Sequence, residues 1–319
     1  MLSGVAFALA AGLMWGLIFL GPLLLPDYPA VLQSCGRYLA FGLIALPLAW
    51  LDRRELSRLR RADWRAALGL AAIGNLLYYL FVASAIQHAG APLPTVIIGT
   101  LPVVITVAAN LRHPHEGRLP WRRLVPCLAV ILLGIACVNQ VEVAALAADG
   151  AADFGRYASG AALAVGAVAC WTWYPLKNAA WLRQHPDRHP RAWATAQGIA
   201  TLPLALAGYL AYWAWNGLSG ASFAMPLGPD PLRFVGLMAA IGLFASWLGT
   251  LCWNEASQRL PTTLVGQLIV FETLAALAYA YLLRGAWPPV LTLVGVGLLL
   301  LGVLGAARIR PRPTTVAAG

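Results

Sequence analysis

The sequence predicts an all-α membrane protein with ten transmembrane helices, arranged as two five-helix repeats of opposite orientation. Of its 319 residues, 60% are hydrophobic and only 11% are charged, whereas about 25% of the residues in a soluble globular domain are charged. Apolar runs of about 18 residues or more recur along the whole chain, and each is long enough to cross a hydrocarbon core about 30 Å thick. Arginine is also distributed unevenly between the connections that join these runs.

Ten spans account for the apolar runs. Their expected ranges are 3–25, 30–51, 66–88, 92–111, 122–140, 158–182, 193–215, 233–256, 261–283 and 287–307. The first run has neither a basic flank nor an obvious cleavage site, so we expect a retained helix rather than a signal peptide. The five cysteines fall inside apolar spans and form no CxxC pair, which argues against disulfides and metal sites.

The connections between the spans alternate in charge. Seventeen arginines belong to one set of connections, in 52–65, 112–123, 183–191, at 259 and in 308–313, and three belong to the other set, at Arg156, Arg233 and Arg284. By the positive-inside rule the arginine-rich side is cytoplasmic, which places both termini in the cytoplasm. The net charge of +10 is then a signal of topology, and no nucleic-acid partner is expected. The expected partner is the lipid bilayer.

Three pairs of similar segments, in the same order along the chain, indicate an internal repeat. Gly4–Trp15 resembles Gly160–Trp171, Pro94-Thr95 with Gly99 resembles Pro261-Thr262 with Gly266, and Leu133–Ile135 resembles Leu301–Val303. Because five spans is an odd number, the two copies must face opposite ways across the bilayer. The expected division is a first repeat over 1–140, an extracytoplasmic linker over 141–157, a second repeat over 158–307 and a cytoplasmic tail over 308–319.

Inverted repeats are typical of transporters, which bind their substrate near the midplane where the repeats meet. Polar groups deep in the bilayer are the first candidates for such a site, because an unsatisfied one is costly there. Aromatic side chains at the same depth are candidates as well. We expect a central cavity lined by Trp15, Asn75, Tyr78, Tyr79, Pro102, Trp171, Tyr174, Trp253, Asn254, Gln267, Phe271 and Glu272.

Position in the spans supports several of these residues. Asn75, Tyr78 and Tyr79 follow i, i+3, i+4 spacing and therefore share one helix face. Pro102 is expected to free a backbone carbonyl in the middle of the membrane. Glu272 lies about eleven residues from either end of its span, so it must pair, protonate or line water.

Other intramembrane residues have structural interpretations. Lys177 lies about six residues from Arg183, so its amine can snorkel to the interface, with a substrate contact as the alternative. Arg37, about eight residues into the second span, is interpreted as an anchor between helices. The spans 193–215 and 287–307 have few polar residues in their middles and are expected at the periphery.

Enzyme and channel functions are not favoured. Gly217–Gly220 fits the GxSG pattern of intramembrane serine proteases, but that chemistry needs a histidine on a later helix, and His189 is the last histidine in the chain. The sequence contains no HExxH motif, no intramembrane aspartate pair and no repeated filter segment. No catalytic residue and no cofactor are expected.

The chain resembles the drug/metabolite transporter superfamily, EamA type. The resemblance rests on the small-residue run ending at Trp15-Gly16, on Gly36–Tyr38, on the Leu-Pro-Thr openings of spans four and nine, and on the ten-span plan. Gly266–Leu274, together with Trp253–Ala256, is similar to the aromatic amino acid exporters of that superfamily. One departure is Leu283-Arg284-Gly285, where many members have a glycine–glutamate pair.

The resemblance implies efflux of a small molecule across a bacterial inner (plasma) membrane, through a central cavity that opens alternately to each side. Aromatic side chains can stack on a ring and attract an ammonium group, so an aromatic amino acid fits the candidate residues. An exporter of cationic drugs or of other small metabolites is the alternative within transport. A membrane scaffold or enzyme is the alternative from another class.

Overall fold

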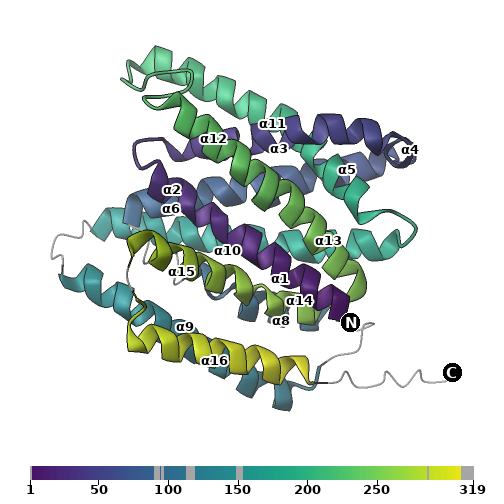
Figure 1. Cartoon of the computed structure of the whole chain (residues 1–319), viewed down its shortest axis with the longest axis vertical. Coiled ribbons are helices and arrows are strands. Elements are labelled where there is room, and N and C mark those ends of the chain that lie inside the picture. The colour runs from purple at the N-terminus through teal and green to yellow at the C-terminus, as the bar shows by residue number, and fades with distance from the viewer. Residues whose placement is uncertain are drawn as a thin grey trace.

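The computed structural model describes residues 2–89, 94, 97–112, 119–148, 154–285 and 287–309. Every regular element within these residues is a helix (Figure 1), which confirms the all-α class. The elements up to residue 148 are α1 (Leu2–Gly16), η1 (Leu17–Phe19), α2 (Leu20–Leu24), α3 (Ala30–Leu51), α4 (Arg53–Leu56), α5 (Arg61–Gly69), η2 (Leu70–Leu77), α6 (Tyr78–Ala89), α8 (Leu101–Arg112) and α9 (Trp121–Ala148). Those that follow are α10 (Phe154–Gln184), α11 (Pro190–Ser219), α12 (Pro231–Ile241), η4 (Gly242–Leu248), α13 (Gly249–Arg259), α14 (Thr262–Leu268), α15 (Val270–Arg284) and α16 (Val290–Ala307).

The lengths of these helices are compatible with the ten expected spans. Within the described residues, six helical segments are long and apolar enough to cross a membrane, and two shorter apolar helices, Leu101–Leu111 and Val290–Ala306, accompany them. The helices α9, with 28 residues, and α10, with 31, are longer than the roughly 20 residues that span 30 Å. Each of the ten expected ranges contains a helical stretch, here called a rod, that consists of one helix or of several consecutive helical segments.

The expected linker over 141–157 is largely helical. Helix α9 continues to Ala148 and α10 begins at Phe154, so only residues 149–153 lie outside the described helices here. The reason is local. The segment Val143–Ala148 is rich in alanine and leucine, which are the strongest helix formers, and no proline or glycine interrupts it.

Contacts between helices pair the two halves of the chain. Helix α3 packs against α11, α8 against α14 and α9 against α16, and each of these pairs joins equivalent spans of the two expected repeats. Helix α6 of span three packs against α10 of span six. Helix α1 of span one packs against α13 of span eight, which is the equivalent pair when the two repeats are exchanged. The arrangement is compatible with an inverted repeat. Figure 1 also shows the start of α1 and the end of α16 at the same end of the bundle.

Glycines allow the closest approach between α9 and α16. A Cβ atom at Gly134 would lie 2.8 Å from the carbonyl oxygen of Gly295, and one at Gly302 would lie 2.6 Å from Cγ1 of Ile131. Lipid supplies no hydrophobic force that brings helices together, so close backbone packing of this kind holds them in contact. The two glycines belong to the Leu-Gly segments that the sequence matched between the repeats.

Replacing Gly302 is therefore expected to destabilise the fold. The change Gly302→Val forces a branched side chain against Ile131 and the Cys127 carbonyl, and overpacking of this kind costs about 1–3 kcal/mol. The matched control on the same helix is Gly297→Val, because a Cβ at Gly297 meets nothing within 4 Å. Thermal unfolding in detergent should show a lower Tm for the first variant only. Equal melting temperatures would contradict this packing.

Candidate functional site

Irregular helical segments occur inside several rods, away from their ends. The segment η1 is a 3-10 turn, η2 and η4 are π-helical, and Ile269 interrupts the rod formed by α14 and α15. The two π segments lie in the rods that the repeat relates to each other. Single-turn π segments are frequent at functional sites, and irregular backbone at membrane depth occurs only where protein or a water-filled cavity covers it. These segments mark the interior of the bundle as the region to examine.

Five buried rings form the aromatic cluster, which consists of Trp15, Tyr78, Trp171, Tyr174 and Trp253. Trp171 stacks on Tyr78, with ring centroids 4.5 Å apart, and on Tyr174, with centroids 4.9 Å apart. Trp15 meets Trp171 edge-on at 5.1 Å and lies 4.9 Å from Trp253. The rings come from α1, α6, α10 and α13, so the cluster joins the two halves of the chain. All five are residues that the sequence predicted for the site.

A hydrogen-bonded network fixes one side of the cluster. The hydroxyl of Tyr174 donates to Oε1 of Gln197 at 2.8 Å, and Nε2 of Gln197 donates to Oδ1 of Asn178 at 3.1 Å. Asn178 also accepts from Nε1 of Trp193 and donates to Oδ1 of Asn254. Each of these polar groups is therefore held by the protein itself.

The prediction that span seven is peripheral is wrong. Helix α11 places Trp193, Gln197 and Thr201 in the buried interior, against α3, η2 and α13. The spacing of Gln197 and Thr201 at i and i+4 puts both on one face, and this signal could have revealed the inward side. It was missed because the polar residues of this span cluster toward its start.

A second set of buried polar atoms has no hydrogen-bond partner among the described residues. The set comprises the hydroxyl of Tyr78, Nε1 of Trp171 and of Trp253, both side-chain polar atoms of Gln267, both carboxyl oxygens of Glu272 and Nη1 of Arg37. Leaving a buried polar group unpaired costs about 1–3 kcal/mol, and more for a charged one. These buried groups are the ones that a polar ligand or water would satisfy.

Arg37 is more than a link between helices. Its Nε donates to Oγ of Ser246 in η4 at 2.9 Å, which agrees with the structural interpretation. Its guanidinium also lies over the rings of Tyr38 and Tyr79, 4.7 Å from each centroid, while Nη1 is left without a partner. One face of the cation is thus stabilised by cation–π contact, and part of its hydrogen-bonding capacity is unused.

Glu272 lies in the first turn of α15, directly after the break at Ile269. Its side chain is 3% exposed, and its charge interacts electrostatically with Arg37. The two groups form no ion pair within 4 Å in the part of the chain that the structure describes. A carboxylate at a helix N-terminus is favoured by the helix dipole, which partly offsets its burial.

Three predicted residues have polar groups that the protein already uses. The hydroxyl of Tyr79 donates to the carbonyl of Ile18 at 3.1 Å. Nδ2 of Asn75 lies 3.5 Å from Oγ1 of Thr201. Asn254 bonds to Asn178, as described above, and to the carbonyl of Pro190. The polar groups of these side chains are hydrogen-bonded within the protein, so a substrate would contact only the remaining surface of each side chain.

The remaining residues that the sequence analysis considered are not members of the aromatic cluster. Pro102 is the second residue of α8 rather than a mid-helix proline. A turn at residues 99 and 100 separates α8 from the helical residues 97 and 98, so the helix is interrupted directly before Pro102, at a position in the first turn where proline is tolerated. Phe271 is half-buried and packs against the hydrophobic core. Lys177 is exposed on α10, which agrees with an interfacial position.

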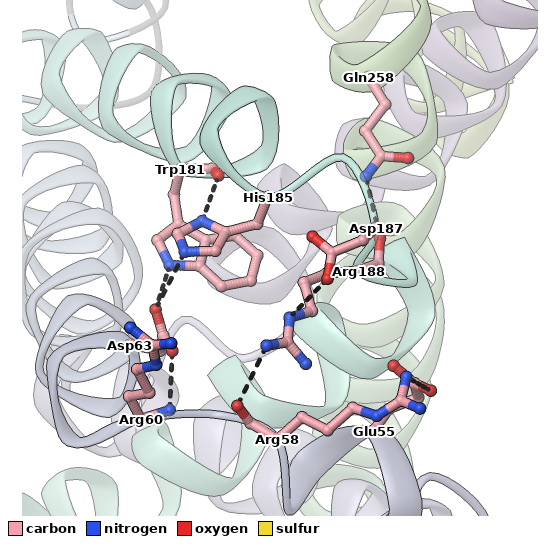
Figure 2. A network of polar contacts seen from close by, with 9 residues as sticks. All are labelled: Glu55, Arg58, Arg60, Asp63, Trp181, His185, Asp187, Arg188 and Gln258. Carbon is pink, nitrogen blue, oxygen red and sulfur yellow. Dashed lines mark hydrogen bonds and ion pairs between the residues drawn. The ribbon is translucent and has the colours of Figure 1, made fainter.

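At the end of the bundle that contains α4, a polar network closes the interior (Figure 2). Asp63 accepts from Nε1 of Trp181 at 3.0 Å and from the Arg60 backbone at 2.8 Å, and His185 lies 3.6 Å from the same carboxylate. Arg188 donates to the carbonyl of Arg58. The first half of the chain is thereby tied to the connection between α10 and α11.

A buried carboxylate strengthens this closure. Asp52, at the end of α3, accepts from Nε of Arg191 and from the hydroxyl of Thr195, both at 2.9 Å. Asp52 is only 3% exposed, whereas the side chain of Arg191 is 55% exposed, so the carboxylate is shielded from solvent and the guanidinium is not. The arginine distribution predicts that this end is cytoplasmic.

The opposite end is closed around Tyr28. Its hydroxyl donates to the carbonyl of Leu227 at 3.0 Å and accepts from the Asp230 backbone at 2.9 Å. Its ring stacks on Phe234, with centroids 4.8 Å apart. An apolar groove of about 730 Å³ between α8 and α10 lies outside the cluster, and its lining includes Val107, Val168 and Trp173.

The described residues contain no group of three or more metal-ligating side chains. What they do contain is a bundle of apolar helices with an interior site built from both halves of the chain. That combination is characteristic of a helical membrane transporter.

Comparison with known proteins identifies the family. Residues 2–140 match the EamA-like transporter family. Over 317 residues the chain is 56% identical to the inner membrane protein YtfF of Escherichia coli (strain K12), covering 99% of this chain and 98% of YtfF. The chain belongs to the EamA-like transporter family.

A solved structure agrees with this fold. One crystal structure is similar to the chain with a TM-score of 0.68 over 95% of this chain and 97% of that one, at 19% identity. At this identity the similarity concerns the fold alone. The name of YtfF states a location and no substrate, so the likeness to aromatic amino acid exporters stays a prediction.

Two conservative substitutions test whether the polar groups are partnered as described. Tyr174→Phe leaves Oε1 of Gln197 buried and unpaired, and should lower the free energy of unfolding by about 1–3 kcal/mol. Tyr78→Phe removes a buried hydroxyl that has no partner, so the ligand-free protein should keep or gain stability. Chemical or thermal unfolding in detergent compares the two, each serving as the control for the other. Equal losses in both variants would contradict the assignment.

Proposed function

We propose that this chain exports amino acids, preferring aromatic ones, across the bacterial inner membrane by alternating access through a central cavity. The observation that carries the proposal is the aromatic cluster at the junction of the two halves, bordered by buried polar atoms without partners. A substrate with a ring and polar groups complements both features. The EamA-like family supports transport as the general function.

The chemistry of the site favours an amphipathic substrate. A ring inserted among the tryptophan and tyrosine side chains gains about 0.5–1.5 kcal/mol per good aromatic pair beyond area burial. The unpaired groups of Gln267, Tyr78 and Glu272 offer both donors and acceptors to the polar end of such a molecule. A purely apolar solute would leave them unsatisfied.

Membrane location and topology follow from sequence and relative together. YtfF is an inner membrane protein, and the arginine distribution favours two cytoplasmic termini. The ten rods and their paired contacts support an inverted repeat, with the substrate site at its centre. The function is transport rather than catalysis, with no cofactor.

The main alternative is an exporter of cationic drugs. Aromatic rings and one buried acid also suit an organic cation, and Glu272 provides that acid. Arg37 argues against this alternative, because a buried positive charge beside the site repels a second cation.

Transport by purified protein in liposomes tests the proposal. We expect uptake of labelled phenylalanine, competed by unlabelled tryptophan and tyrosine more strongly than by small aliphatic amino acids. Labelled methyl viologen should not be taken up. The assay is run with and without a pH gradient, and protein-free liposomes are the control. Transport of methyl viologen without phenylalanine would overturn the proposal in favour of the alternative.

Alternating access also predicts that the closed cytoplasmic end can be loosened. In Asp52→Asn the partners Arg191 and Thr195 lose their charged acceptor, so the population open to the cytoplasm should increase. The readout is labelling of Gln267→Cys, in a protein otherwise free of cysteine, by a membrane-impermeant thiol reagent applied from that side. A several-fold faster reaction is expected.

The matched control for this test is Glu55→Gln, which removes an acid from the same connection that pairs with exposed Arg58. Its labelling rate should equal that of the parent protein. If Asp52→Asn also labels at the parent rate, this carboxylate does not hold the end closed.

A further inference from the structure

Two charged side chains lie in the buried interior with their hydrogen bonding incomplete. Arg37 is 4% exposed and Glu272 is 3% exposed. They come from α3 and α15, which belong to different halves of the chain. We propose that Arg37 binds the carboxylate and Glu272 binds the ammonium group of a zwitterionic α-amino acid. The inference rests on the proposed transport function and specifies how the substrate is selected and oriented.

Other buried acids of this chain provide an internal comparison. Asp52 accepts hydrogen bonds from Arg191 and Thr195, and Asp63 accepts them from Trp181 and the Arg60 backbone. These structural carboxylates are fully engaged by protein donors. Glu272 is equally buried, yet neither of its oxygens has a partner among the described residues. The contrast indicates that its partner is supplied from outside the chain.

The guanidinium of Arg37 is held in place but not saturated. Its Nε donates a hydrogen bond to Oγ of Ser246, and its Cζ atom lies 4.7 Å from the ring centroids of Tyr38 and Tyr79. These contacts fix the plane of the cation while Nη1 stays unpaired. A fixed guanidinium with free donors is the arrangement that recognises a carboxylate.

Tyr78 connects the charged groups to the aromatic cluster. Its ring stacks on Trp171 at 4.5 Å, its buried hydroxyl has no partner among the described residues, and the ring of the next residue, Tyr79, lies 4.7 Å from the guanidinium of Arg37. The backbone of α15 also lies near the cluster, because a Cβ at Gly12 would lie 3.0 Å from the backbone nitrogen of Glu272. Gly12 is one helical turn from Trp15. The charged pair therefore borders the stacked rings.

Charge balance selects the ligand class. A simple cation bound at Glu272 leaves Arg37 uncompensated in a medium of low dielectric, and a simple anion bound at Arg37 leaves Glu272 uncompensated. A zwitterion compensates both at once, and an α-amino acid carries its two charges on a single carbon beside the side chain. The rings of the cluster then receive the side chain.

The test uses two sets of three ligands. Within a set the side chain is the same, and the ligands carry both charged groups, the ammonium alone or the carboxylate alone. The aromatic set is phenylalanine, phenethylamine and 3-phenylpropionate, and the aliphatic set is leucine, 3-methylbutylamine and 4-methylpentanoate. Binding to the purified protein is measured by calorimetry or by competition in liposomes. The parent protein should bind each amino acid at least about tenfold more tightly than its amine or acid analogue, since a hydrogen bond to a charged group contributes about 1.5–3 kcal/mol.

The variants separate the two subsites. Arg37→Gln should lose at least about tenfold in affinity for the amino acid and little for the amine. Glu272→Gln should lose at least about tenfold in affinity for the amino acid and little for the acid analogue. Arg37→Lys and Glu272→Asp retain charge and should keep part of the selectivity. Matched controls are Arg233→Gln and Glu255→Gln, which lie outside the buried site. Melting temperatures confirm that each variant is folded.

The outcomes distinguish this inference from the proposed function. Variants that weaken the amino acid, amine and acid by the same factor overturn the charged subsites while leaving export intact. Charge-selective losses seen in the leucine set alone support the subsites and overturn the aromatic preference. A parent protein that binds the amines more tightly than the amino acids overturns both and favours the cationic alternative.

Discussion

Polar groups in the interior of a membrane protein must find partners inside the protein, and this constraint organises the whole structure. The bilayer offers no water to an unpaired hydroxyl, amide or charge. Asn178 illustrates the usual solution, because its side chain joins Trp193, Gln197 and Asn254 in one network. The same logic makes the exceptions informative. Glu272 and Gln267 are buried without partners among the described residues, so a ligand is the natural candidate for the missing partner.

The site depends on contributions from both halves of the chain. Trp15 and Trp171 occupy equivalent positions in the two expected repeats, and their rings meet at 5.1 Å. The π-helical segments η2 and η4 also lie in equivalent rods, and each is followed by site residues, Tyr78 after η2 and Trp253 after η4. A repeat that folds back on its own copy places equivalent side chains face to face. The aromatic cluster therefore contains rings from both halves of the chain.

Much of the fold and part of the site could be predicted from the sequence. The length and apolarity of each span determine helices, because only helices satisfy the backbone within a single segment. Five of the predicted site residues form the aromatic cluster, since large rings at mid-depth have to pack together. The spacing of Gln197 and Thr201 places both on one helix face, but spacing alone does not say which neighbours that face meets. Their span has an apolar middle, and only the packing of α11 against α3 and η2 turns its polar face inward.

The sequence by itself determined the helical class, the span positions and the side of the bundle on which arginine accumulates. These properties depend on local composition and on the solvent that each segment meets. Tertiary structure alone decided which polar groups became partnered. Arg37 and Asp52 are both buried charges on α3 or at its end, yet Asp52 is saturated by Arg191 and Thr195 while Arg37 retains a free donor. That difference depends on contacts between residues more than 100 positions apart, whose approach no local pattern encodes.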